Sequence, residues 1–284
     1  MRKIPWLLIG SLLLSAAAPA SAAENIFDLH VHLHDGEASI RQYQQQLEAD
    51  KVAITGFGAM WFGGGNQAPA GQIAATRAHN DELLAMASRH PGMLPIATVH
   101  PYDGREAVAE LERVAGRGIK VLKLHPHTQK FEVPDPRVGA LVKRAGELNV
   151  VVLFDNAGIV PDDCENLFNL AVNNPKTKFI FAHMGGLNFR FWNIIALART
   201  AENFFADNVY FDISGTSVLA AGSPLQQEFV WTIHNVGVDH VLLGSDFPQI
   251  SLAQTLAALD KLGLTESEKA GIRFDNASKL LGLK

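Results

Sequence analysis

Short apolar runs alternate with longer stretches of mixed apolar and polar residues from about residue 25 to the end of the chain. Runs such as VVVLF and KFIFA are apolar without alternation, which is typical of parallel strands covered on both faces. These runs predict strands at residues 25–33, 51–57, 93–99, 119–124, 150–154, 177–182, 208–213 and 240–243. The stretches between them predict helices at residues 38–49, 73–89, 105–115, 136–148, 162–173, 188–203, 224–235 and 252–262.

This alternation of strands and helices predicts an α/β fold, a single-domain (β/α)8 TIM barrel spanning residues 23–284. Such barrels have about 250 residues, and their active sites lie at the carboxyl ends of the strands. A doubly wound open sheet is the alternative architecture for the same pattern. In either fold, residues that follow the strands are the candidates for chemistry.

The first 22 residues have the pattern of a secretory signal peptide. Arg2 and Lys3 precede an apolar run at residues 6–14, and residues 20–22 form an Ala-Ser-Ala cleavage pattern. The run is shorter than the roughly 20 apolar residues that span a bilayer, so we expect no membrane anchor. The pattern predicts a cleaved signal and a periplasmic or secreted protein.

Composition excludes some classes of protein. Hydrophobic residues make up 48% of the chain and charged residues 19%, which is typical of a chain with a large core. A formal net charge of −5 argues against a nucleic-acid partner and leaves a small-molecule substrate as the expected one. The single Cys164 cannot form an internal disulfide, and a buried small residue is its simplest role. The sequence leaves open whether the chain forms a homo-oligomer.

Imidazole and carboxylate side chains gather where the predicted strands end. They are His30, His32, His100, Lys123, His125, Asp155, His183, Asp212 and Asp246. Because the carboxyl ends of parallel barrel strands meet at one mouth, we expect these side chains to lie close together.

His30 and His32 are two positions apart on the first strand, so their side chains face the same side. His34 adjoins the turn signal Asp35-Gly36 and is expected to leave that face. A single-metal site needs about three protein ligands, and Asp246 and His183 are the candidates that complete it. Alternatively, the pair is a polar strand face, Asp246 caps a loop and His183 is an ordinary hydrogen-bonded histidine.

Several segments in order resemble the amidohydrolase-related family (amidohydrolase 2 type), which are metal-dependent hydrolases of TIM-barrel fold. These segments are DLHVHLH, GIKVLKLHP, FAHMGG, VYFDISG, LLGSDFP and NASKLLGL. The resemblance implies a divalent metal, usually zinc, held by His30, His32 and Asp246. It also implies that His183 either binds the metal or polarises the substrate.

The chain departs from this family at Asp155, because VVLFDNAG stands where many relatives have a histidine after the fifth strand. A carboxylate shifts the preference of a metal site from zinc toward harder ions such as manganese. Asp155 is interpreted as a substitute metal ligand, as a hydrogen-bond acceptor for a ligand histidine, or as the mark of altered chemistry.

Further candidates would contact substrate. Lys123 and His125 share a face of the fourth strand and are expected to bind substrate. For Lys123, the alternatives are a structural ion pair and a carboxylated lysine that bridges two metals. Trp61 and Phe62, in a Gly-rich segment after the second strand, are expected to stack on a cyclic substrate from a lid or to pack within the loop. Asp212 either orients a ligand histidine or caps a turn.

These observations favour an exported metal-dependent hydrolase in which a metal-activated water attacks an amide, ester or lactone carbonyl. Asp246 would accept the proton of the water, and His183 would bind the metal or stabilise the oxyanion. A metal-dependent, non-oxidative decarboxylase of an aromatic or unsaturated carboxylate is the alternative enzyme. A non-catalytic barrel that binds a ligand or metal is the third hypothesis.

Overall fold

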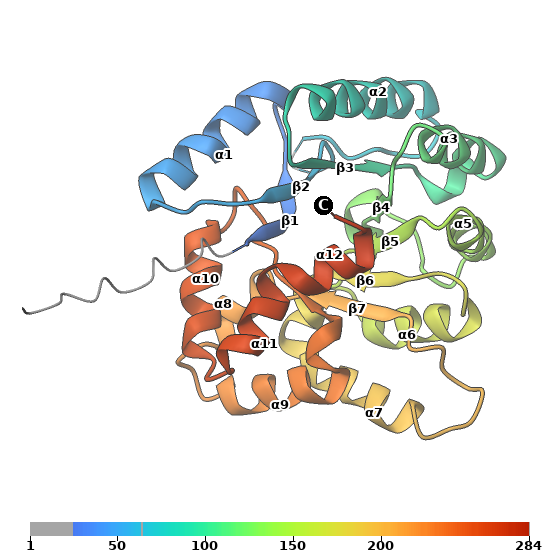
Figure 1. The fold of residues 1–284 in the computed structure, drawn as a ribbon. Helices are drawn as coiled ribbons and strands as arrows, with labels where there is room; N and C mark the ends of the chain where they lie inside the picture. Colours follow the sequence, from blue (N-terminus) through green and yellow to red (C-terminus); the bar gives the residue numbers. More distant parts are fainter. Residues whose placement is uncertain (1–24, 64, 284) are drawn as a thin grey trace, which may run out of the picture.

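Eight parallel strands form the centre of the computed structural model, which describes residues 25–63 and 65–283 (Figure 1). The predicted signal peptide lies outside the described residues. The strands pair in sequence order and are β1 Phe27–His32, β2 Gly56–Met60, β3 Met93–Thr98, β4 Val121–Leu124, β5 Val151–Phe154, β6 Phe179–Phe181, β7 Val209–Asp212 and β8 Val241–Leu242. This arrangement confirms the predicted (β/α)8 barrel.

Backbone hydrogen bonds between β1 and the segment that begins with β8 bring the two ends of the sheet together. The amide of Leu29 donates to the carbonyl of Leu243 at 3.0 Å, and the amide of His32 donates to the carbonyl of Phe247 at 2.9 Å. The sheet is thus a nearly closed barrel, and the residues after β8 are fixed directly beside the end of β1.

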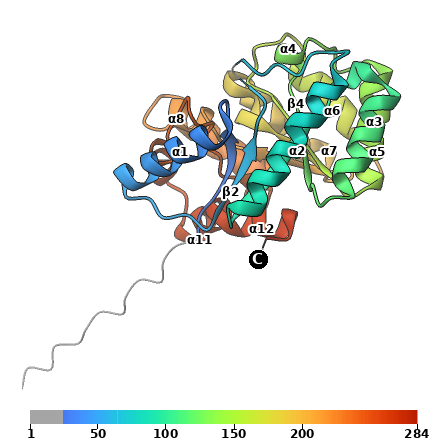
Figure 2. The same ribbon diagram turned by 90° about the horizontal axis from the view of Figure 1, so that it is seen from above.

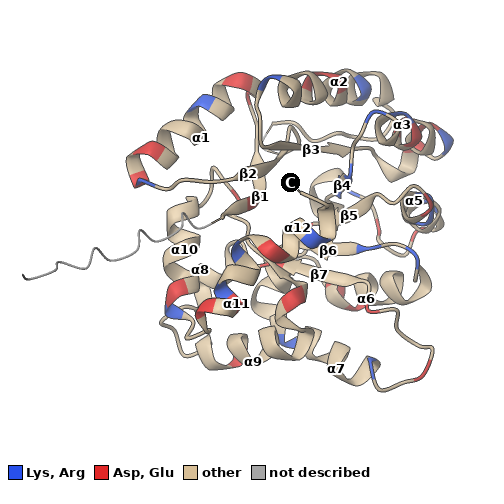
Figure 3. Ribbon diagram, in the orientation of Figure 1, with Lys and Arg blue, Asp and Glu red and all other residues tan. Residues whose placement is uncertain are grey.

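Helices surround the sheet (Figure 1). They carry most of the charged residues, whereas the strands are largely uncharged (Figure 3). They are α1 Gly36–Asp50, α2 Ile73–Arg89, α3 Arg105–Ala115, α4 Pro126–Gln129, α5 Pro136–Glu147, α6 Asp163–Asn173, α7 Ile194–Ala198, α8 Thr216–Ala220, α9 Gln226–Val236, α10 Leu252–Lys261, α11 Glu266–Ala270 and α12 Asn276–Leu281. Short 3₁₀ helices are η1 Pro101–Asp103, η2 Ala182–Asn193 and η3 Val238–His240, and η4 Gly271–Asp275 is a π-helix. Within the described part of the chain, no helix has the length and apolar character that a membrane span requires.

The two ends of the barrel are covered differently. Figure 2 shows α4 and α8 on one side of the barrel and α11 and α12 on the other. Leu280 and Leu281 of α12 pack with the side chains inside the barrel, including Leu29 and Leu242. The amino-terminal end of the barrel is therefore closed by α12, and the candidate site residues lie at the opposite end.

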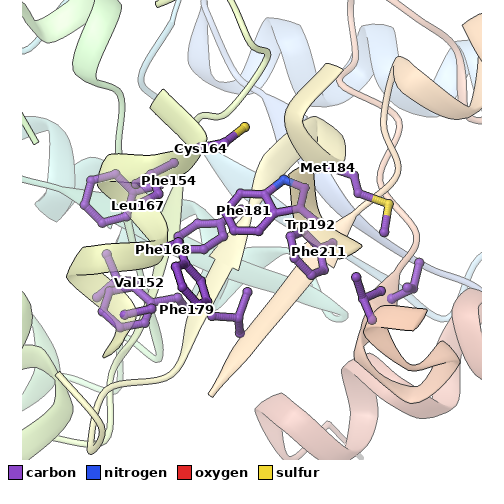
Figure 4. Close-up of a cluster of buried hydrophobic side chains, with 14 of the residues drawn as sticks. Val152, Phe154, Cys164, Leu167, Phe168, Phe179, Phe181, Met184, Trp192 and Phe211 are labelled. Atoms are coloured by element: carbon purple, nitrogen blue, oxygen red, sulfur yellow. The ribbon is translucent and has the colours of Figure 1, made fainter. Parts of the chain in front are cut away.

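A layer of aromatic side chains between the sheet and the outer helices fixes the segment after β6 (Figure 4). Phe179 and Phe181 face outward from β6, while Ile180 between them faces the barrel interior. Trp192 of η2 stacks on Phe181 and contacts Phe211 of β7, with ring centroids 4.9 Å apart in both pairs. This packing anchors η2, which carries His183 near its start.

Most predicted strands end within about two residues of the observed ones, but the second does not. We predicted it at residues 51–57, and β2 is Gly56–Met60. A Cβ atom at Gly58 would overlap the carbonyl oxygen of Leu29 on the neighbouring strand, so only glycine fits this close approach. The pattern also missed α11, η4 and α12, and the predicted helix at residues 188–203 is replaced by η2 and α7.

Candidate metal centre and active site

Three side chains at the carboxyl-end mouth of the barrel point at one another. His30 Nε2 and His32 Nε2, both from β1, lie 3.1 Å apart. Asp246 Oδ1, from the loop after β8, lies 3.4 Å from His30 Nε2 and 3.2 Å from His32 Nε2. Among the described residues, these three form the group whose ligand atoms all lie within 4.8 Å of one another. We call this group the triad.

The other ring nitrogen of each histidine faces an oxygen acceptor, which assigns the tautomers. His30 Nδ1 lies 3.0 Å from Asp212 Oδ2, and His32 Nδ1 lies 2.6 Å from the carbonyl oxygen of Phe62. Each Nδ1 therefore carries the proton, and each Nε2 turns a lone pair toward the triad. Burial, followed by the charge of Lys123, lowers the pKa of His30 to about 4, so this ring is neutral at pH 7.

Three electron pairs thus face one another at about 3 Å, an arrangement that a cation between them would stabilise. Two neutral imidazoles and one carboxylate are a donor set that zinc and manganese both accept. The residues present fit a divalent metal, and His30, His32 and Asp246 are the residues that would hold it.

A buried carboxylate below the triad fixes its backbone. Asp28 Oδ1 accepts hydrogen bonds from the amide of Ser245 at 2.8 Å and the amide of His30 at 3.2 Å. Asp28 Oδ2 accepts the hydroxyl of Tyr43 at 2.8 Å, and burial raises the pKa of Asp28 to about 6. Asp28 joins β1 to the loop that carries Asp246, a role that its place in DLHVHLH could have suggested and that we did not predict.

The segment after β2 contributes to the triad through its backbone. Phe62 and Trp61 are buried, and the Trp61 indole donates to Asn80 Oδ1 at 2.9 Å. Neither side chain lines the cavity at the mouth, and both pack within the loop in this structure, so their stacking on a substrate stays a prediction. Gly63, at φ +122°, lies so close to His32 that a Cβ atom would stand 2.6 Å from its Nδ1. The close approach that delivers the Phe62 carbonyl therefore requires glycine at this position.

Asp155 faces two other histidines. Its Oδ1 lies 3.2 Å from His183 Nε2 and 3.5 Å from His125 Nε2. His183 Nδ1 in turn lies 3.1 Å from the carbonyl oxygen of Ser214, so both nitrogens of this ring face oxygen acceptors. Burial opposes protonation of His183, but the hydrogen bond and charge of Asp155 outweigh it and raise the pKa to about 9. In this structure His183 is a cation paired with Asp155, and the prediction that both bind metal stays a prediction.

Asp212 connects the triad with His183. Besides facing His30 Nδ1, it accepts the amides of His183 at 3.1 Å and Ser214 at 3.0 Å through Oδ1, together with the Ser214 hydroxyl. Burial favours the neutral acid, yet His30, His183 and Ser214 hold the pKa of Asp212 below its usual range. This geometry is what the orientation of a ligand histidine requires. Ser214, within the FDISG segment, was not predicted.

Lys123 and His100 end neighbouring strands but differ in their surroundings. Lys123 is fully buried, its Nζ lies 3.4 Å from His30 Nε2, and the described residues offer it no carboxylate at salt-bridge distance. His100 Nε2 lies 2.7 Å from the carbonyl of Gln129, and its Nδ1 accepts the amide of Tyr102. His100 is therefore a structural residue and not part of the predicted cluster.

A cavity of about 410 Å³ opens above the triad. It is lined by His32, Gly63, Gln67, His125, His127, Thr128, Asp155, Ala157, Ile159, His183, Gly186, Ser214, Gly215, Thr216, Leu219, Asp246 and Gln249. This volume is within the range of small-molecule sites. The carboxylate of Asp246 and the ring of His183 both face the space where a substrate would lie.

Comparison with known proteins gives a family and several similar structures. A family model described as amidohydrolase matches residues 27–283, and no curated protein matches the sequence. A Staphylococcus aureus protein described as an amidohydrolase is 21% identical, with a TM-score of 0.72 over 92% of this chain and 99% of that one. The 5-carboxyvanillate decarboxylase of Sphingomonas paucimobilis is 14% identical, with a TM-score of 0.69 over 93% and 100%. A dihydroxybenzoic acid decarboxylase from Polaromonas, with bound manganese and 2-nitroresorcinol, is 15% identical, with a TM-score of 0.65 over 92% and 97%. At these identities the likeness shows the fold.

Proposed function

The chain belongs to the amidohydrolase family, and from this premise we propose that it is a metal-dependent, non-oxidative decarboxylase of a small carboxylate. The observation that carries the proposal is the triad of inward-facing lone pairs beside a buried Lys123 that has no carboxylate partner among the described residues. A divalent cation held between these lone pairs, beside the lysine, would give the mouth a positive charge that attracts an anionic substrate. The decarboxylases among the similar structures support the same proposal.

A divalent ion held by His30, His32 and Asp246 would supply positive charge that binds and polarises the substrate carboxylate. We propose manganese or zinc. Manganese is supported by two similar decarboxylase structures that contain it, and zinc by the pair of imidazole ligands.

The residues of the chain account for the movement of the proton. In decarboxylation the bond between the carbon and the carboxyl group breaks, carbon dioxide leaves, and the carbon takes up a proton. That proton would come from His183, a cation that lines the cavity: its Nε2 would leave the oxygen of Asp155 and give the proton to the carbon, while Nδ1 stays against the carbonyl of Ser214. Burial raises the pKa of Asp246, but its surroundings, among them the positive charge of His183, outweigh burial and lower this pKa, so the side chain is ionised.

A hydrolase is the second candidate, and one observation favours it. Among the described residues that line the cavity, none is Phe, Tyr or Trp, so a planar aromatic acid finds no aromatic side chain there except histidine rings. Asp246 would then act as the base that accepts the proton of a water molecule. We further propose export to the periplasm or beyond, on the N-terminal signal pattern alone.

Product analysis tests the proposal. Protein loaded with Mn²⁺ or Zn²⁺ is incubated with aromatic and unsaturated carboxylates and, separately, with amides, esters and lactones. Release of carbon dioxide that is lost in Asp246→Asn supports the decarboxylase. Turnover of an amide, ester or lactone without carbon dioxide would replace it with the hydrolase. Protein that binds no metal and turns over none of these compounds would favour a non-catalytic barrel.

A further inference from the structure

Exposed apolar side chains gather on one arc of the mouth. Among the described residues, six large hydrophobic side chains are exposed, and Ile159, Leu187 and Leu219 are three of them, with exposed fractions of 65%, 60% and 60%. Ile159 and Leu219 line the cavity above the triad, and Leu187 follows Gly186, which also lines it. They come from the segments after β5, β6 and β7, which are adjacent strands. We call these three residues the apolar rim.

The two sides of the cavity differ in chemistry. The apolar side chains of the lining, Ala157, Ile159 and Leu219, come from the segments after β5 and β7, which also contribute the polar Asp155, Ser214 and Thr216. The segments after β2, β4 and β8 contribute side chains that can hydrogen bond, namely Gln67, His125, His127, Thr128 and Gln249. Among the described residues, all the apolar side chains of the lining therefore come from the β5–β7 side, where the exposed Ile159 and Leu219 offer hydrocarbon to a ligand.

We propose that the substrate is an amphiphilic carboxylate, whose acid group lies at the triad and whose apolar body lies against the apolar rim. The position of the acid group rests on the proposed function, whereas the position of the apolar body rests on the rim alone. Binding would remove from water the side chains that the free protein leaves exposed, which is favourable in proportion to the apolar area covered.

Continuity with the cavity is what favours a small molecule as the occupant of the rim. Ile159 and Leu219 line the same space as Asp246 and His183, so a ligand at the triad reaches them without any rearrangement of the chain. A second copy of the chain that covers the mouth is the other occupant, and the test below separates the two.

The test measures the binding of a series of linear carboxylates to the Mn²⁺-loaded protein by calorimetry. Acetate, butyrate, hexanoate and octanoate share the acid group and differ only in the apolar body. We expect the affinity to rise about threefold for each added methylene, somewhat less than the roughly fourfold of full burial. Leu219→Asn and Ile159→Asn should flatten this rise while leaving the affinity for acetate within about twofold.

Leu197→Asn is the matched control, because Leu197 is 64% exposed on α7 and does not line the cavity. It should keep the full dependence on chain length. An affinity that does not depend on chain length, or that falls equally in Leu197→Asn, would overturn the proposal. So would a rim variant that changes the oligomeric state in ultracentrifugation and leaves the dependence on chain length unchanged.

The same titration in metal-free protein separates the two proposals. Affinity that rises with chain length whether or not Mn²⁺ is present supports the apolar rim and contradicts a metal-bound acid group. Affinity that requires Mn²⁺ and ignores chain length supports the metal centre and contradicts the rim.

Discussion

Replacement of Asp212 by asparagine should change the tautomer of His30 and thereby weaken metal binding. Asp212 Oδ1 accepts the amides of His183 and Ser214, while Oδ2 faces His30 Nδ1 at 3.0 Å. The single oxygen of asparagine fits best where two backbone amides converge, so its NH₂ group would face His30. His30 Nδ1 must then accept a hydrogen bond, and the ring proton moves to Nε2, where it blocks the lone pair of the triad.

The expected loss of metal affinity is large enough to measure. Loss of the group that orients a ligand histidine typically lowers metal affinity about 10- to 100-fold, which is about 1.4 to 2.7 kcal/mol. We expect the upper part of this range, because the substitution also turns one of three ligands into a hydrogen-bond donor. Mn²⁺ titration followed by electron paramagnetic resonance at pH 7 gives the affinity directly.

Asp207→Asn is a suitable control, since Asp207 is an exposed carboxylate that pairs with Arg199 at 2.7 Å, away from the cavity. It should bind Mn²⁺ as the wild type does, and thermal unfolding should show both variants folded. If folded Asp212→Asn bound Mn²⁺ within about twofold of the wild type, the assignment of the His30 tautomer would be wrong.

Three further substitutions test other parts of the structure. Asp246→Asn should abolish turnover and weaken Mn²⁺ binding in a folded protein, and a variant with normal turnover of a verified substrate would contradict its role. Asp155→Asn should leave the Mn²⁺ affinity within about threefold of the wild type. It should lower the pKa of His183, measured by NMR of the imidazole, because the hydrogen bond and charge of Asp155 that oppose burial are lost. A loss of Mn²⁺ affinity as large as that of Asp246→Asn would instead identify Asp155 as a metal ligand. Burial raises the pKa of Asp163 to about 6 from 3.8, so its ionisation destabilises the fold above about pH 6 and costs nothing below about pH 4. Asp163→Asn should therefore increase the free energy of unfolding by about 1 to 2 kcal/mol at pH 8. This figure allows for the loss of a negative charge at the start of α6, where it interacts favourably with the helix dipole. A gain of the same size at pH 4 would refute this reasoning.

The barrel could be predicted from the sequence because its strands are buried on both faces and therefore appear as apolar runs. This holds for β5, whose sequence VVLF is buried throughout. It fails at β2, where Gly56 and Gly58 carry no side chain to signal a strand. These glycines let the neighbouring backbones approach closely. A hydrophobicity pattern cannot detect this role, because the role depends on having no side chain.

The triad could be predicted for a related reason, since alternation in β1 puts His30 and His32 on one face whatever surrounds them. The partners that assign their tautomers were harder to find. The carbonyl of Phe62 is a backbone group that any residue could offer, and the aromatic side chains next to it suggested a stacking role instead. His100 shows the opposite error, because a histidine at a strand end can also serve only to cap η1.

The sequence alone left the role of Asp155 open, and the charged groups around this residue indicate what it does. Asp155 and His183 form a pair that carries no net charge. At the triad itself, the single carboxylate of Asp246 would neutralise half the charge of a bound divalent ion. A triad loaded in this way would keep one positive charge, which the carboxylate of the proposed substrate would balance. A histidine at position 155 would remove the hydrogen bond and the charge that keep His183 protonated, so the aspartate is what makes His183 a cation at the mouth.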